Sequence, residues 1–134
     1  MAGIGYSAPR PLTPLGFAVD LSTSTVSGAT TVTAAAVLAK FFNKTRVRKM
    51  RLKCTTIPHA NVAVATVIAM NGTTTVASGD AAGAAANGFV DLTPSTTEAN
   101  TFMPVDGTMT IKVVATASAS GLSLGDYDIW AELE

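Results

Sequence analysis

The residues that could take part in chemistry are few, and the most conspicuous of them are basic. Residues 44–53, KTRVRKMRLK, hold six of the nine Lys and Arg residues of the chain, and we call them the basic strip. A strip of this kind can bind nucleic-acid phosphates, and nucleic-acid sites usually add aromatic residues for base stacking. The basic strip contains no aromatic residue. Its composition therefore favours a sheet face whose charges are matched inside the chain, or a contact between subunits, and we expect no nucleic-acid partner.

The remaining reactive side chains predict no active site. His59 follows Pro58, and no recognisable Ser or Cys motif surrounds it to form a nucleophilic pair. Cys54 is the only cysteine and falls at an inward strand position, where a thiol is usually a packing group. Asp126 and Asp128 lack the further ligands that calcium needs. We expect no catalytic residue, metal or cofactor, and hence no enzyme.

Length and composition narrow the class of protein. A chain of 134 residues is the size of one domain and can bury a core without disulfides or metals. Charged residues make up only 13% of it and the formal net charge is zero, which gives no global attraction for nucleic acid or anionic lipid. No run of about 18 apolar residues and no signal-peptide pattern occurs. We expect no membrane partner.

The first residues predict an extended arm. Residues 1–16 carry three Pro and three Gly with scattered apolar residues, a composition that favours extended backbone over a packed element. The expected domains are this arm and one β-sandwich domain over residues 17–134. The arm is either a loose terminus or a segment that docks on a partner through Ile4, Tyr6, Leu12 and Leu15.

From residue 17 onward the sequence is typical of strands. Thr and Val are abundant, and Gly, Asn, Asp and Pro punctuate the chain at short intervals. Six to eight strands in about 115 residues predict an all-β fold, an antiparallel β-sandwich or jelly roll. Asn71-Gly72 predicts a two-residue type I′ hairpin turn. The main exception is residues 33–42, whose apolar spacing predicts a short helix or turn.

The two most highly charged segments alternate in a way that predicts their pairing. In the closing strand, the set Asp126, Asp128, Trp130, Glu132 and Glu134 points one way and the set Tyr127, Ile129, Ala131 and Leu133 points the other. In the basic strip, the inward set is Met50, Leu52 and Cys54 and the outward set is Lys49, Arg51 and Lys53. Val47 is out of phase, and a bulge near Arg48-Lys49 would restore the register. We therefore predict that the acidic strand lies beside the basic one.

Three residues of these strands are candidates for a protein interface. Arg46 and Arg48 are the best placed to pair with a neighbouring molecule, because the acids of the last strand need not reach them. Trp130 falls among the charges of the outer face, where it would stack under an Arg such as Arg51 or anchor a protein contact. A local twist that tucks Trp130 into the core is the alternative.

The order of the later segments carries a resemblance. A basic strand ending VRKMRLKCTT, an Asn-Gly hairpin, GFVDLTPSTTEANTFMPVDGTMTIKVVATAS and the terminal GDYDIWAELE together resemble small jelly-roll or β-sandwich decoration (cement) proteins of tailed bacteriophage capsids. The likeness covers roughly residues 44–134. It lies in the general character and order of these segments, and it includes no diagnostic motif.

The resemblance implies a structural virion protein on the outer surface of the capsid, made in the host cytoplasm. Such a protein would bridge neighbouring major capsid proteins, stabilise the head and often be a homotrimer. The alternative is a phage fibre or tail domain, or a carbohydrate-binding β-sandwich module, which needs exposed aromatic residues on a groove.

Overall fold

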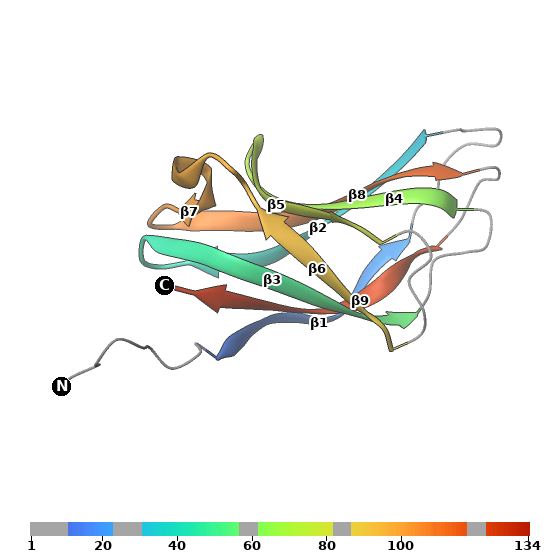
Figure 1. Cartoon of the computed structure of the whole chain (residues 1–134), viewed down its shortest axis with the longest axis horizontal. Helices are drawn as coiled ribbons and strands as arrows, with labels where there is room; N and C mark the ends of the chain where they lie inside the picture. Colours follow the sequence, from blue (N-terminus) through green and yellow to red (C-terminus); the bar gives the residue numbers. More distant parts are fainter. Residues whose placement is uncertain (1–10, 23–30, 57–61, 82–86, 118–122) are drawn as a thin grey trace.

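The protein is built from β-strands joined by short connections (Figure 1). The computed structural model describes residues 11–22, 31–56, 62–81, 87–117 and 123–134. Within these ranges the strands are β1 (Leu12–Ser22), β2 (Thr31–Phe41), β3 (Thr45–Thr56), β4 (Val62–Asn71), β5 (Thr74–Asp80), β6 (Phe89–Pro94), β7 (Phe102–Met103), β8 (Gly107–Ala117) and β9 (Ser123–Leu133). One short 3-10 helix, η1 (Glu98–Thr101), precedes β7.

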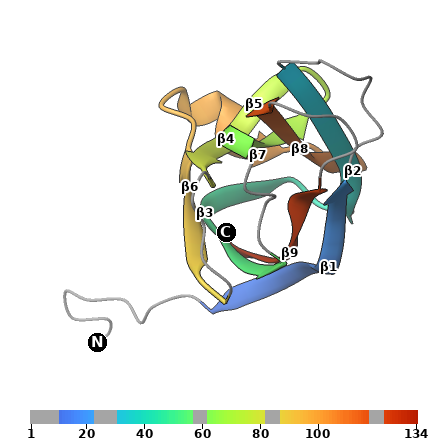
Figure 2. The same cartoon turned by 90° about the vertical axis from the view of Figure 1, so that its right-hand side faces the viewer.

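The strands form one continuous antiparallel sheet that wraps around the core. Its order is β1-β9-β3-β6-β5-β4-β8-β2, with β7 paired to β3. Seen end-on, the strands surround the interior as a nearly closed barrel, and β1 and β2, the two ends of the path, lie side by side (Figure 2). Leu38 of β2 packs close to Gly16 of β1, where a Cβ would lie 2.9 Å from the Leu38 Cδ1 atom. The prediction of an all-β antiparallel fold is confirmed.

The core is filled by alternate residues of the strands, including the inward set predicted for the basic strip. Met50, Leu52 and Cys54 of β3 are fully buried. The same holds for the inward residues of the two other clearly alternating strands, which are Met109, Ile111 and Val113 of β8 and Tyr127, Ile129 and Ala131 of β9. Because successive strand residues point to opposite faces, the neighbours of these residues form the outer surface of the barrel.

The predicted helix over residues 33–42 was wrong. Residues 33–41 lie in β2, which pairs with β8 almost along its whole length, from Thr31 opposite Thr116 to Phe41 opposite Gly107. Of its large apolar residues, Phe41 is buried and Leu38 is half-buried, whereas Val37 and Phe42 are 76% and 73% exposed. The hydrogen-bond ladder offered by β8 overrides the helical propensity of the alanine run, as tertiary context commonly does.

The predicted hairpin exists, but its turn differs from the expected one. Asn71 pairs with Thr74, so Gly72 and Thr73 are the two turn residues. Gly72 has a φ of 60° and Thr73 keeps a negative φ. A positive φ at the first central position alone belongs to a type II′ turn, in which glycine is preferred at that position.

The predicted arm is shorter than expected where the structure describes it. β1 begins at Leu12, so residues 12–16 belong to the sheet. Pro14 fits there because β1 is an end strand of the path, and the register shifts on both sides of Gly16 interrupt the ladder with β9. Residues 1–10 lie outside the described residues.

Candidate binding face

The basic strip and the acidic strand are neighbours, as predicted. β3 pairs antiparallel with β9, with Lys49 opposite Glu132 and Lys53 opposite Asp128. The register shifts between Val47 and Lys49, which confirms the predicted bulge at Arg48. This shift lets Val47, Met50 and Leu52 all point inward, because the bulged residue restores the alternation.

The outer face of β9, β3 and β6 carries balanced charge. In its central rows, three cations stand opposite three carboxylates, so the formal sum of these six residues is zero; they are Lys49, Arg51, Lys53, Asp91, Asp128 and Glu132. Across one row of the sheet, Trp130 of β9 lies opposite Arg51, which in turn lies opposite Asp91 of β6. We call this surface the outer face.

Among the described residues, Asp91 forms the shortest ion pair of the basic strip, with Arg51. The Arg51 Nε–H donates to Asp91 Oδ1 at 2.7 Å, and Nη2 donates to Oδ2 at 3.2 Å. This two-pronged geometry is the preferred pairing of a guanidinium with a carboxylate. Hydrogen bonding to Arg51 lowers the pKa of Asp91, and the same bond raises the pKa of Arg51. The partner therefore comes from β6, whereas the sequence predicted partners from the last strand.

Arg46 and Arg48 find acids within the chain, contrary to prediction. Arg46 Nη1 lies 3.1 Å from Glu98 Oε1 of η1, and its guanidinium lies over the ring of Phe102. Arg48 Nη1 lies 3.2 Å from Glu134 Oε2. For Arg46, the prediction did not anticipate that η1 packs against β3 and brings Glu98 near. For Arg48, it did not anticipate that the exposed side chain at the bulge lies close to Glu134.

Two lysines of the basic strip, Lys49 and Lys53, lie opposite carboxylates of β9 in the sheet. Lys49 and Lys53 stand directly opposite Glu132 and Asp128, although no ion pair within 4.0 Å involves these lysines among the described residues. The Asp128 carboxylate instead accepts the backbone N–H of Ala18 at 2.8 Å, where β1 adopts a positive φ of 48°. The two lysines therefore have opposite charges nearby without forming an ion pair, and each cross-strand pair contributes about 0.2–1 kcal/mol to the stability of the fold.

Trp130 lies on the outer face and is half-buried. The alternative that a twist tucks it into the core was wrong. Its ring meets Phe17 of β1 edge-on, with centroids 6.3 Å apart and planes at 84°. Arg51 does not stack on it as predicted but lies over the ring of Phe89, 5.3 Å from the centroid. Phe17 and Phe89 are 66% and 59% exposed, so aromatic rings from three strands frame the cations.

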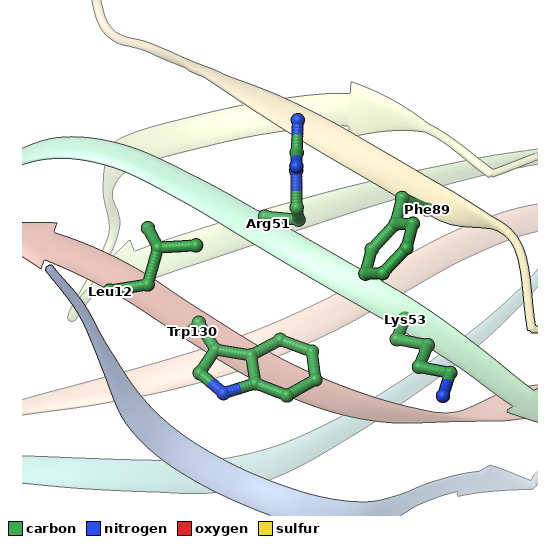
Figure 3. A pocket seen from close by; sticks show the side chains of 5 residues that line it. All are labelled: Leu12, Arg51, Lys53, Phe89 and Trp130. Carbon is green, nitrogen blue, oxygen red and sulfur yellow. The ribbon is translucent and has the colours of Figure 1, made fainter.

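A pocket of about 450 Å³ opens on this face. It is lined by Leu12, Arg51, Lys53, Phe89 and Trp130, which come from β1, β3, β6 and β9. Figure 3 shows Trp130 and Phe89 on opposite sides of β3, with Arg51 and Lys53 projecting from the strand between them. A second hollow of about 370 Å³ lies beside η1, where Lys44 Nζ lies 5.0 Å from the ring centroid of Phe102.

The other predicted interface residues divide into three groups. Leu12 is 37% exposed and lines the pocket. Leu15 is half-buried and packs against the core, so it serves the fold itself. Ile4 and Tyr6 lie outside the described residues, and so does His59.

Sequence reasoning missed Phe89, Asp91 and Phe17. A signal existed for the first two, because FVDLT alternates and places Phe89 and Asp91 on the face opposite the buried Val90 and Leu92. No feature of the sequence indicated that β6 lies beside β3.

Cys54 is buried, and this burial raises the pKa of its thiol.

Two kinds of feature are absent from the described residues. No cluster of three or more His, Cys, Asp or Glu residues able to hold a metal ion occurs in this part of the chain. Among the same residues, no helix has the length and apolar character needed to cross a membrane.

Comparison of the chain with models of protein families, with curated proteins and with solved structures gave no match. The function must therefore be argued from the residues themselves and from the resemblance given above.

Proposed function

We propose that this protein is a structural virion protein that decorates the outer surface of a capsid, where it bridges major capsid proteins and stabilises the head. The observation that carries the proposal is the internal matching of the basic strip. Arg46, Arg48 and Arg51 each meet a carboxylate of the same chain, which favours a strip matched within the chain over a nucleic-acid surface. The resemblance to phage decoration proteins supplies the virion setting, a homotrimer and synthesis in the host cytoplasm.

Exposed apolar side chains offer a surface for the capsid. Phe42 is 73% and Val105 is 61% exposed. Phe41 pairs with Gly107, so the turn that holds Phe42 and the turn that holds Val105 lie at the same end of the barrel. We call these two residues the end surface. Burying each of them against a partner is worth roughly 1.5–3 kcal/mol, enough for about a tenfold effect on affinity per residue.

Co-sedimentation with undecorated capsids of the parent virus tests the proposal. The wild-type protein should bind saturably, and light scattering should report a trimer in solution. The double variant Phe42→Glu/Val105→Glu should bind at least about tenfold more weakly, because each substitution places a charge where an apolar contact is needed. Phe89→Ala, which removes another exposed ring, this one from the outer face, is the matched control and should bind like the wild type. Absence of saturable binding by the wild-type protein would refute the proposal.

A further inference from the structure

The pocket on the outer face has no role in the proposed capsid contact. We propose that it binds a neutral saccharide, with a pyranose ring lying against Trp130 and Phe89 and with its hydroxyl groups meeting Arg51 and Lys53. Its volume of about 450 Å³ falls within the usual range of about 300–1,000 Å³ for small-molecule sites. This would give the protein a ligand separate from any capsid partner.

Both rings are held in place before any ligand arrives. Trp130 is half-buried and braced by the edge of Phe17, and the guanidinium of Arg51 lies over Phe89. Phe89 nevertheless remains 59% exposed, so part of its ring is open to a ligand. Aromatic rings that are already positioned bind apolar C–H faces at little cost in side-chain entropy. A pyranose presents such faces.

The charge of the surrounding surface argues against an anion. In the sheet, Arg51, Lys53 and Lys49 stand opposite Asp91, Asp128 and Glu132 respectively. A phosphate or a nucleic-acid strand would meet these carboxylates together with the cations, and it would gain little from the release of counterions. The two charged residues that line the pocket, Arg51 and Lys53, each face a carboxylate of a neighbouring strand, so the surroundings favour a ligand without net charge.

The hydrogen-bonding groups point to hydroxyls. Asp91 engages Nε and one Nη2 hydrogen of Arg51, which leaves other guanidinium N–H groups able to donate. The Lys53 ammonium is a second donor in the lining, and Asp91, which is bonded to Arg51 just outside the lining residues, keeps lone pairs able to accept. A ligand that satisfies this mixture must both accept and donate at neighbouring positions. A hydroxyl group does both, and a sugar carries several around an apolar ring.

Because the chain has a single tryptophan, its fluorescence can be used to measure binding at the pocket. Trp130 is the only Trp of the chain and lines the pocket, so its fluorescence reports on that site alone. The full-length protein is titrated with neutral hexasaccharides of glucose, N-acetylglucosamine, mannose and galactose in α and β linkage, and screened on a broad glycan array. The comparison probes are a ten-nucleotide thymidine oligomer and the synthetic peptide MAGIGYSAPR, which has the sequence of residues 1–10.

At least one neutral oligosaccharide should shift the Trp130 emission saturably. Phe89→Ala should weaken that binding at least about tenfold, since removing an exposed ring takes away one wall without touching the core. Phe42→Ala removes an exposed ring at the end surface and should leave saccharide binding unchanged. Calorimetry on Trp130→Ala, which has no fluorescent reporter, should show no saccharide binding.

Three results would overturn the inference. They are the absence of binding to every neutral glycan, saccharide binding unaltered by Phe89→Ala, and a Trp130 response to the oligonucleotide or the peptide but to no saccharide. The test is independent of the capsid assay, because Phe89→Ala should lose the saccharide and keep the capsid, whereas Phe42→Glu/Val105→Glu should do the reverse.

Discussion

Reversing both charges of the Lys49–Glu132 pair should restore the stability that either single reversal removes. The two residues lie directly opposite each other in the β3–β9 ladder. Opposite charges about 7 Å apart attract by about 0.6 kcal/mol in water, and like charges repel by the same amount. Lys49→Glu or Glu132→Lys alone should therefore cost about 1 kcal/mol at low salt, and the double variant should cost close to nothing. The coupling free energy of the cycle comes to about 2 kcal/mol as an upper value.

Urea unfolding followed by Trp130 fluorescence at low ionic strength measures the cycle. Screening should cut the coupling by about half at 0.15 M salt and nearly abolish it at 1 M, where the Debye length is about 3 Å. Lys40 provides a matched control, since it is exposed on β2 and lies opposite Thr108, so Lys40→Glu should show no coupling to Glu132→Lys. Additive single variants at low salt, with no recovery in the double variant, would refute the charge-matched register.

Three further outcomes follow from the contacts around the core and the outer face. The pKa of Asp91 is lowered by Arg51, so its contribution to folding is present above the ordinary Asp value of 3.8 and is lost as pH falls through the lowered value. Acid titration should therefore shrink the difference in free energy of unfolding between wild type and Asp91→Asn, and a constant difference would contradict this. Gly79→Ala places a Cβ 2.7 Å from the Asp91 carbonyl oxygen and 2.9 Å from Leu92 Cδ2, so it should destabilise by about 1–3 kcal/mol in urea unfolding; an unchanged midpoint would count against the packing of β5 on β6. The buried Cys54 thiol, with its raised pKa, should react with a chromogenic disulfide reagent only after unfolding, and rapid labelling of the native protein would show that the core is open there.

Alternation along single strands was enough to predict much of the fold. β3 and β9 bury inward residues expected of them, because a two-residue period assigns side chains to faces whatever the neighbours are. The out-of-phase Val47 was sufficient to locate the bulge at Arg48. Opposite charge on two outward faces then selected β9 as a neighbour of β3, because like charges opposed across a ladder are destabilising.

Predictions failed where pairing partners decided the structure. The alanine-rich segment of β2 has the local pattern of a helix, and only the ladder with β8 makes it a strand. The prolines near the start suggested an arm, yet Pro14 is accommodated at the end strand of the sheet. In the hairpin, the dipeptide Asn71-Gly72 was the right signal, but its position in the turn is fixed by the register of β4 on β5.

The candidate site was predictable only in part. Alternation along the chain placed Arg51, Lys53 and Trp130 on the outer face, although a core position for Trp130 stayed open as an alternative. The pocket also needs Phe89 of β6, and the neutralisation of Arg51 needs Asp91 of the same strand. Residues 44–53 contain no aromatic residue, but the folded sheet sets aromatic rings on both sides of them (Figure 3). These rings flank the basic strip because β9 and β6 lie on either side of β3. Alternation within one segment does not indicate which strands will be its neighbours.

The most direct test of charge matching is a titration of fluorescently labelled single-stranded and duplex DNA at about 0.15 M salt, read by anisotropy. Charge matching predicts no saturable binding by the wild-type protein up to about 100 μM, which is the weak end of non-specific affinities. Asp91→Asn/Asp128→Asn/Glu132→Gln, folded by circular dichroism, should gain salt-sensitive binding because its three cations are no longer balanced. Micromolar binding of DNA by the wild-type protein, weakened by salt and lost when Lys49, Arg51 and Lys53 are replaced by Ala, would contradict it.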